Sequence, residues 1–316
     1  MNLKGLTKLT TLWLPSRVSD AGLERVTALP ELSQLFLDNT RVTDAGLPKL
    51  LGISKLGSLS LHNARVSAKG FANLKSVLPG VHLAWSERNR TAAEAVLAAG
   101  GKVSIRSKGQ QDDRPVKVVD ELPAEYFQVT QVSLAGVPNL PEDVLWKLSS
   151  LNDPDFDHLD VLDVSGQARQ DFRQLEGLCQ LVELSLARTK VDNSSLGVLK
   201  NLTGLRRLIL DGCPISGQGV QHLKDLPNLT ELHLGCPALT NLGIVFLAPL
   251  QQLERLSLAG SSVSDEGLKH LHGLTNLKEL DLSQTRVTAA GLAKLQRALP
   301  QCRVQLESAT KPAERP

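Results

Sequence analysis

The sequence predicts an α/β solenoid in which parallel strands line a concave face and short helices cover the convex face. Leucines open an L-x-L tripeptide at a fixed spacing of 24 residues, and each interval repeats one order of strand, turn, short helix and return. In the most regular part these tripeptides begin at Leu184, Leu208, Leu232, Leu256 and Leu280, with Val304 in the next position. One repeat is too small to bury its apolar side chains, so neighbouring repeats must stack and share a core.

Residues 205–228 illustrate one repeat. Leu208 and Leu210 point toward the same core because side chains alternate along a strand. Val220 and Leu223 follow at the i, i+3 spacing of a helix. A period of this length with this tripeptide is typical of leucine-rich repeats.

A hydroxyl residue recurs just before each predicted helix, followed two or three residues later by glycine. We expect the hydroxyl to cap the helix by accepting a bond from an unpaired amide of its first turn. We expect the glycine to allow close backbone approach to the neighbouring repeat. The hydroxyl residues are Ser19, Thr43, Ser67, Ser216, Thr240, Ser264 and Thr288, and the glycines are Gly22, Gly46, Gly70, Gly219, Gly243, Gly267 and Gly291.

Residues 18–23, 42–47 and 263–268 resemble the V-T-D-x-G-L motif of the cysteine-containing subfamily of leucine-rich repeats. That subfamily is known from F-box proteins and from large bacterial repeat proteins. Cys213 stands at the position that names it, and threonine replaces the cysteine at Thr40, Thr189 and Thr285, as in the bacterial branch. The resemblance covers roughly 85% of the chain by its repeat period. It implies a horseshoe fold and is unspecific for the partner.

The regular pattern is interrupted once, which predicts two arrays. Thr91 opens a capping-box pattern for a helix that ends at Gly100, and two strands are expected at 102–106 and 116–119. We interpret this segment as a cap for the second array, with a flexible linker as the alternative. The predicted parts are a first array at 1–86, an α-β-β cap or linker at 87–127, a second array at 128–306 and a disordered tail at 307–316.

The second array contains an insertion of about six residues near 152–158, where carboxylates alternate. An EF-hand calcium loop counted from Asp153 would need glycine and glutamate where His158 and Val164 stand. A solvated loop is therefore favoured over a calcium site.

Composition excludes several classes of function. A net charge of +2 is too balanced for a sequence-independent binder of nucleic acid or anionic membranes. Four cysteines without a C-x-x-C pair indicate a reducing compartment, and we predict the cytoplasm. Neither a secretory signal nor an apolar run of about 18 residues occurs.

The sequence predicts no enzyme, catalytic residue, cofactor or metal site. It lacks the G-x-S-x-G, H-E-x-x-H, P-loop and dinucleotide-binding patterns. His222 and His233 have no cysteine or carboxylate at ligand spacing, and His270 and His272 point to different sides of a helix. Cys213 and Cys236 lie on adjacent repeats and could approach each other, but we interpret them as core filling.

Charges alternate in sign at the position before each L-x-L of the second array. Adjacent strands lie about 4.8 Å apart, so each arginine is expected between two carboxylates. A self-neutralising ladder explains this pattern without a ligand, and a charge-patterned binding surface is the alternative. The ladder residues are Glu183, Arg207, Glu231, Arg255, Glu279 and Arg303.

Trp13 and Phe36 occupy the position between the two core leucines on consecutive repeats. Two exposed aromatic side chains there are either a binding hot spot or a surface that further chain covers. The candidate partner-binding residues on the concave face are Trp13, Phe36, Gln34, Asp38, His62, His233 and Asp281.

We therefore predict a non-catalytic scaffold that binds a protein partner on its concave face. One alternative, suggested by the F-box resemblance, is a substrate adaptor for ubiquitin ligation. Another is the regulatory portion of a larger protein such as a kinase. The sequence does not specify the partner or the oligomeric state.

Overall fold

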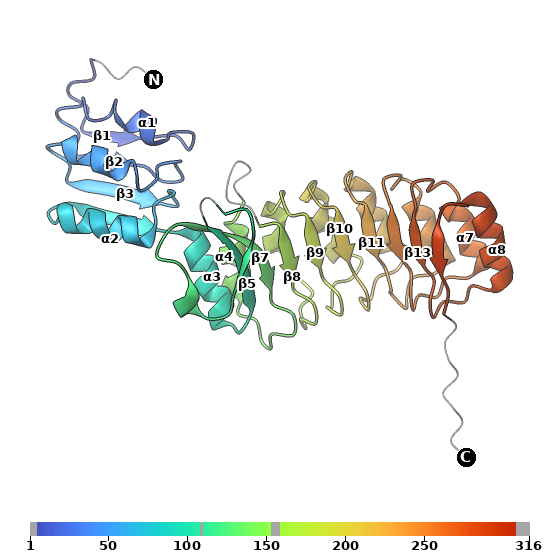
Figure 1. Ribbon diagram of the computed structural model, residues 1–316. Helices are drawn as coiled ribbons and strands as arrows, with labels where there is room; N and C mark the ends of the chain where they lie inside the picture. The colour runs from blue at the N-terminus through green and yellow to red at the C-terminus, as the bar shows by residue number, and fades with distance from the viewer. Residues whose placement is uncertain (1–4, 108–109, 153–158, 308–316) are drawn as a thin grey trace. The chain divides into compact units, whose positions relative to one another are not determined.

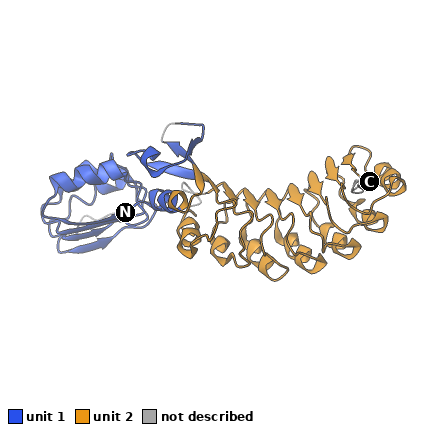
Figure 2. Cartoon of the chain, turned by 90° about the horizontal axis from the view of Figure 1, so that it is seen from below, with its two compact units in different colours: residues 1–95, 104–129 blue, residues 96–103, 130–316 orange. Residues whose placement is uncertain are grey.

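The computed structural model describes residues 5–107, 110–152 and 159–307. The chain divides into two compact units (Figure 2), unit 1 with residues 1–95 and 104–129 and unit 2 with residues 96–103 and 130–316. Residues 153–158 of the predicted solvated loop (152–158) and residues 308–316 of the predicted tail (307–316) lie outside the described residues. The predicted division into arrays and cap stays a prediction.

Unit 1 is built on a four-stranded parallel sheet with the order β1-β2-β3-β4. Its strands are β1 (Thr11–Trp13), β2 (Gln34–Phe36), β3 (Ser58–His62) and β4 (His82–Ser86). Between them lie α1 (Asp20–Leu23), the 3-10 helix η1 (Leu47–Gly52) and α2 (Ala68–Val77). The strands pair in register, with Leu12 opposite Leu35 and Leu35 opposite Leu59. This register places the first leucine of each L-x-L in one row across the sheet.

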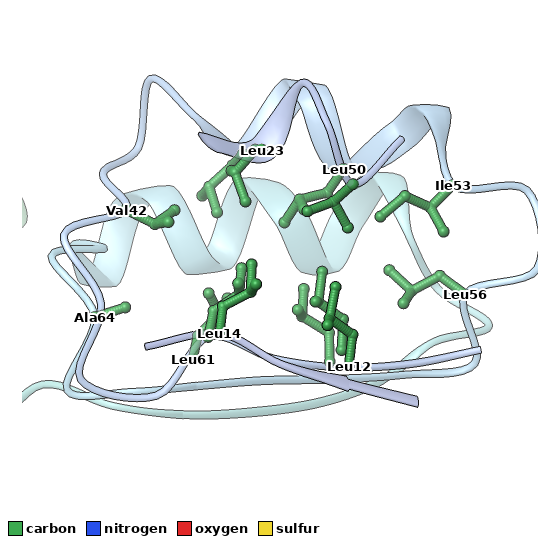
Figure 3. Close-up of a cluster of buried hydrophobic side chains, with 14 of the residues drawn as sticks. Leu12, Leu14, Leu23, Val42, Leu50, Ile53, Leu56, Leu61 and Ala64 are labelled. Atoms are coloured by element: carbon green, nitrogen blue, oxygen red, sulfur yellow. The ribbon is translucent and has the colours of Figure 1, made fainter. Parts of the chain in front are cut away.

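The core of unit 1 lies between these strands and helices. Figure 3 shows Leu12, Leu14 and Leu61 on the strand side facing Leu23 and Leu50 on the helix side. All five are buried. Residues on opposite sides of one repeat therefore meet in a core that runs from repeat to repeat, as the stacking argument requires.

The larger sheet has ten strands in the order β14-β13-β12-β11-β10-β9-β8-β7-β5-β6 (Figure 1). Its strands are β5 (Lys102–Ser107), β6 (Arg114–Val116), β7 (Phe127–Ser133), β8 (Val161–Asp163), β9 (Glu183–Ser185), β10 (Arg207–Ile209), β11 (Glu231–His233), β12 (Arg255–Ser257), β13 (Glu279–Asp281) and β14 (Arg303–Gln305). From β7 to β14 the strands are parallel. The predicted fold class, a leucine-rich repeat solenoid, is confirmed.

Short helices connect these strands and pack on one side of the sheet in unit 2 (Figure 2). In unit 2 they are α4 (Glu142–Ser149), η3 (Arg173–Gly177), η4 (Ser195–Asn201), α5 (Gly217–Val220), η5 (Gln221–Asp225), α6 (Asn241–Ile244), η6 (Val245–Leu247), α7 (Asp265–Leu268), η7 (Lys269–Leu271) and α8 (Ala289–Ala298). Two further helices lie between β4 and β7: α3 (Arg88–Ala98) precedes β5, and η2 (Val119–Glu121) follows β6. We call the opposite side of each sheet, on which residues such as Trp13 and His233 lie, the strand face.

The segment between the arrays differs in detail from the sequence prediction. α3 begins at Arg88, one turn before the predicted start at Thr91, whose amide already donates to the carbonyl of Glu87 (2.9 Å). The helix ends as predicted. Gly100 adopts a φ of 87°, and the amide of Gly101 donates to the carbonyl of Val96 (2.9 Å), which is the glycine-dependent helix stop.

The second predicted strand of this segment, 116–119, is placed wrongly, because β6 spans Arg114–Val116. The carboxylate of Glu121 accepts the backbone amide of Lys117 (2.9 Å) and so ends the strand. β6 is the last strand in the sheet order, and an edge strand is where a proline such as Pro115 is tolerated.

The predicted hydroxyl caps are confirmed at Ser67 and Thr288, whose side chains accept the amides of Gly70 and Gly291. They are wrong at the four-residue helices, whose preceding residues Ser19, Ser216, Thr240 and Ser264 make no side-chain cap. In these tight first turns the glycine amide donates to the backbone carbonyl of the hydroxyl residue instead, at 2.8–3.0 Å. The hydroxyl is therefore available for another contact.

In five repeats, including the two with a hydroxyl cap, an aspartate or asparagine of the preceding repeat contacts this hydroxyl. Asp44 accepts both the amide (2.8 Å) and the hydroxyl (2.6 Å) of Ser67. Asn241 accepts the amide of Ser264 and donates its own side-chain amide to the hydroxyl (2.8 Å). The same links join Asp20 to Thr43, Asn193 to Ser216 and Asp265 to Thr288. We call this set the Asx ladder.

The Asx ladder also explains the recurrent glycine. A Cβ atom on Gly70 would lie 2.1 Å from Oδ1 of Asp44, and one on Gly291 would lie 2.1 Å from Oδ1 of Asp265. No real Cβ is tolerated so close to another heavy atom. The glycine makes room for the carboxylate that links one repeat to the next.

Asp44 allows a direct test of the ladder. We expect Asp44→Ala to lower the free energy of unfolding by about 1–3 kcal/mol, because two bonds of about 0.5–1.5 kcal/mol each are lost. We expect Asp44→Asn to stay near the parent, since asparagine fills the same position at Asn193 and Asn241. Urea unfolding measures both variants. Equal stability of the alanine and asparagine variants would contradict a linking role.

Candidate functional site

The strand face of unit 1 presents a stacked aromatic pair. The rings of Trp13 and Phe36 lie 4.6 Å apart between centroids with an interplanar angle of 6°. Parallel pairing of β1 with β2 places the two residues directly opposite each other. Trp13 is 66% exposed, and Phe36 is half-buried. Phe36 lies beside one face of the Trp13 ring, and among the described residues no strand pairs with the other edge of β1.

The polar candidates of unit 1 are engaged by neighbouring strands. Gln34 accepts the hydroxyl of Thr11 at 3.2 Å. Asp38 accepts the hydroxyl of Ser60 at 2.5 Å and the backbone amide of His62 at 2.9 Å. The His62 ring contacts the hydroxyl of Ser86 at 3.0 Å. These contacts hold the repeats together beside the aromatic pair.

In unit 2 the ladder arginines lie between glutamates. Arg207 is 3.5 Å from Glu183 and 2.9 Å from Glu231. Arg255 is 3.2 Å from Glu231 and 3.3 Å from Glu279. Arg303, on the last strand, pairs with no carboxylate of the described residues. Two of the three arginines are thus neutralised within the sheet.

His233 adds a further charge to this network. Its Nε2 lies 2.9 Å from Glu231, and its Nδ1 lies 3.7 Å from Asp211. The pKa of His233 is raised, mainly by the bond to Asp211, while partial burial opposes the shift and Glu231 adds to it. Partial burial raises the pKa of the Glu231 carboxyl, but a hydrogen bond from His233, the charge of Arg207 and a hydrogen bond from Arg255 outweigh this effect, so the pKa lies below its usual value.

A hollow of about 750 Å³ opens on the strand face over β11 to β14. The residues that line it include Ser257, Ala259, His233 and Asp281. Asp281 accepts the amide of Ser283 at 2.9 Å. The structure thus brings together His233, Asp281 and part of the ladder in unit 2, and Trp13, Phe36, Gln34, Asp38 and His62 in unit 1.

Sequence reasoning missed two features of unit 2. Asp211 follows β10 and reaches His233 of the next repeat, a contact that the 24-residue register could have indicated. Leu242, Val245 and Phe246 are exposed on the helix side, Leu242 by 80%. The sequence does contain a signal for these exposed apolar side chains, because residues 232–253 include no Asp, Glu, Lys or Arg.

The cysteines are free thiols, and three of the four are buried. Cys213 and Cys236 each donate to a carbonyl of the preceding repeat, Leu186 and Leu210, at 3.1 Å. Burial raises the pKa of Cys236 to about 12, so it stays a neutral thiol. Within the described residues, no three His, Cys, Asp or Glu side chains gather in a way that could hold a metal ion. No helix of the described chain is long and apolar enough to cross a membrane.

A family model matches one repeat near the C-terminus. Residues 273–295 match the family model described as Leucine Rich repeat. They run from the turn before β13 into α8 and so cover one full strand-to-helix step. Among curated proteins, none matches this chain in sequence. The cysteine-containing subfamily and the F-box resemblance stay predictions.

Several solved structures are similar to the chain. An internalin of Listeria monocytogenes is 22% identical with a TM-score of 0.45, over 98% of this chain and 76% of that one. Internalin C2 of the same organism is 20% identical with a TM-score of 0.47, over 72% and 88%. A leucine-rich repeat protein of Leptospira interrogans is 19% identical with a TM-score of 0.40, over 95% and 67%. At such identities no partner carries over to this chain.

Proposed function

We propose that this chain is a non-catalytic scaffold that binds a protein partner on its strand faces. The observation that carries the proposal is the exposed Trp13 and Phe36 stack on unit 1. Tryptophan is among the residues most enriched at binding hot spots, and the stack fixes the orientation of its ring before a partner arrives. A rigid platform of this kind loses little conformational entropy on binding.

The surrounding polar side chains support a protein partner over a charged polymer. Gln34 and Asp38 are already hydrogen-bonded across the sheet, which leaves the aromatic pair as the main contact surface of unit 1. In unit 2, Arg207 and Arg255 are each held by two glutamates, which makes them less available to phosphate groups. We therefore propose no nucleic-acid partner.

We also propose that the protein works in the cytoplasm. Four free cysteines support this, because disulfides persist mainly in oxidising compartments. The thiols of Cys213 and Cys236 fill core positions and donate hydrogen bonds there, a role that oxidation would remove.

The decisive experiment compares the parent with Trp13→Ser/Phe36→Ser in affinity capture from the native lysate, followed by titration with the purified partner. We expect the double variant to bind at least about 30-fold more weakly, because one hot-spot residue contributes 2 kcal/mol or more. Circular dichroism verifies that the variant is folded.

Trp146→Ser is the matched control, since Trp146 is also a highly exposed tryptophan, at 58%, but lies on α4. It should retain the partner at the affinity of the parent. Equal binding by the parent and the double variant would exclude the aromatic pair as the binding site.

A further inference from the structure

The ring of His233 lies between carboxylates of two successive repeats. Nε2 faces Glu231, two residues earlier on the same strand, at 2.9 Å. Nδ1 faces Asp211, which follows β10 in the preceding repeat, at 3.7 Å. A doubly protonated ring donates a hydrogen bond to Glu231 and forms an ion pair with Asp211, and so joins the β10 repeat to the β11 repeat.

Asp211 also accepts a hydrogen bond from a backbone amide, and that amide can be used to follow its position. Its Oδ1 accepts the backbone amide of Gly235 at 2.7 Å, immediately after β11. No ion pair between Asp211 and a lysine or arginine occurs among the residues that the structure describes. The carboxylate of Asp211 is therefore held in place by His233 and by one amide.

The two carboxylates differ in what else neutralises them. Glu231 also contacts Arg207 of β10 at 2.9 Å and Arg255 of β12 at 3.2 Å. Arg207 and Arg255 come from the strands on either side of β11. Glu279, Asp281 and Arg303 line the same hollow as His233 from β13 and β14. After loss of a ring proton Glu231 is still paired with Arg207 and Arg255, whereas Asp211 faces the unshared electron pair of a ring nitrogen.

We propose that His233 is a pH-operated latch between the repeats of β10 and β11, which holds Asp211 while the ring carries two protons and releases it toward the strand face when one is lost. The shorter contact to Glu231 keeps the remaining ring proton on Nε2, so Nδ1 becomes the unprotonated atom. The released proton passes to solvent, and the hollow lined by Asp211, His233 and Asp281 becomes more negative by one charge.

The sign of the stability effect follows from the raised pKa of His233. A group whose pKa is higher in the folded state stabilises the fold below its unfolded pKa, about 6.5 for histidine. That contribution is lost as the pH rises through the folded-state pKa. Release of Asp211 is therefore expected as the pH rises above the unfolded-state pKa of histidine, and the closed latch below it. This inference concerns the free protein, so its failure is independent of the proposed function.

Amide and histidine NMR of the full chain between pH 5.5 and 8.5 tests the latch. The Gly235 amide should shift with the same midpoint as the His233 ring, and its protection against hydrogen exchange, corrected for intrinsic rates, should fall about tenfold across that midpoint. The amide of Gly260 is the internal control, because it donates to the backbone carbonyl of Ser283 (2.9 Å) and should not follow the titration.

Two variants separate the latch from general pH effects. His233→Gln should abolish the pH-dependent movement of the Gly235 amide and the acid-side gain in melting temperature. Asp211→Asn should lower the titration midpoint of His233. Circular dichroism at pH 5.5 should show that His233→Gln and Asp211→Asn are both folded. The proposal is overturned if the Gly235 amide stays unchanged while His233 titrates, or if it moves equally in His233→Gln.

Discussion

Leu208→Ala is expected to lower the free energy of unfolding by about 2–5 kcal/mol, the range for a buried leucine truncated to alanine. Leu208 is 0% exposed and lies on β10, in the row of leucines shared by Leu184 and Leu232. Truncation leaves a cavity that the stacked repeats on both sides restrict from collapsing. Urea unfolding followed by circular dichroism measures the change.

Leu242→Ala is the matched control, because the same atoms are removed from a side chain that is 80% exposed. Its free energy of unfolding should change by no more than about 0.5 kcal/mol. Because each repeat contacts only its neighbours, Leu208→Ala should also broaden the unfolding transition as the two sides of the solenoid uncouple. Similar losses in both leucine variants would show that burial does not set the contribution of these residues.

Gly217→Ala is expected to destabilise the protein by about 1–3 kcal/mol, the typical result of inserting a methyl group where no space exists. A Cβ atom on Gly217 would lie 2.7 Å from the Cα of Gly243 and 3.1 Å from its nitrogen. Both neighbours are backbone atoms of α6, so α5 and α6 would have to move apart. Thermal unfolding gives the magnitude.

The control for this variant is Gly197→Ala. Gly197 lies in η4, and a Cβ atom placed on it would meet nothing within 4 Å. Alanine has the better helix propensity, so this variant should match the parent or exceed it slightly. If Gly217→Ala proved as stable as Gly197→Ala, close contact between the helices of adjacent repeats would not limit the residue at 217.

Much of the fold could be predicted from the sequence because one local pattern recurs. The alternation around Leu208 and Leu210 predicts a strand with one buried face, and the constant spacing predicts the in-register pairing of β9, β10 and β11. The end of α3 at Gly100 was also predictable, because a glycine helix stop depends only on neighbouring residues.

The parts that could not be predicted depend on contacts between repeats. The hydroxyl of Ser264 was expected to bind its own helix, but it binds Asn241 of the preceding repeat. Ser or Thr before a helix predicts a cap, and nothing local shows that a side chain from 23 residues earlier competes for it. The contact between Asp211 and His233 is likewise set by the stacking of repeats.

The candidate site also combines features that could be predicted from the sequence with features that could not. The sequence placed Trp13 and Phe36 on one face, but the parallel stacking of their rings depends on side-chain rotamers that no periodicity encodes. The alternating charges at Glu183, Arg207 and Glu231 indicated neighbours, and the structure gives the distances at which they pair.

The Asx ladder makes the repeats interchangeable modules. Every link joins an Asp or Asn to a Ser or Thr at the same offset in the next repeat, and both acceptor types occupy the same position. A duplicated 24-residue segment that carries both residues of a link, such as 241–264, would therefore bring a complete link with it when inserted in phase. The length of such a gene could change by whole repeats through unequal recombination without a new junction having to evolve.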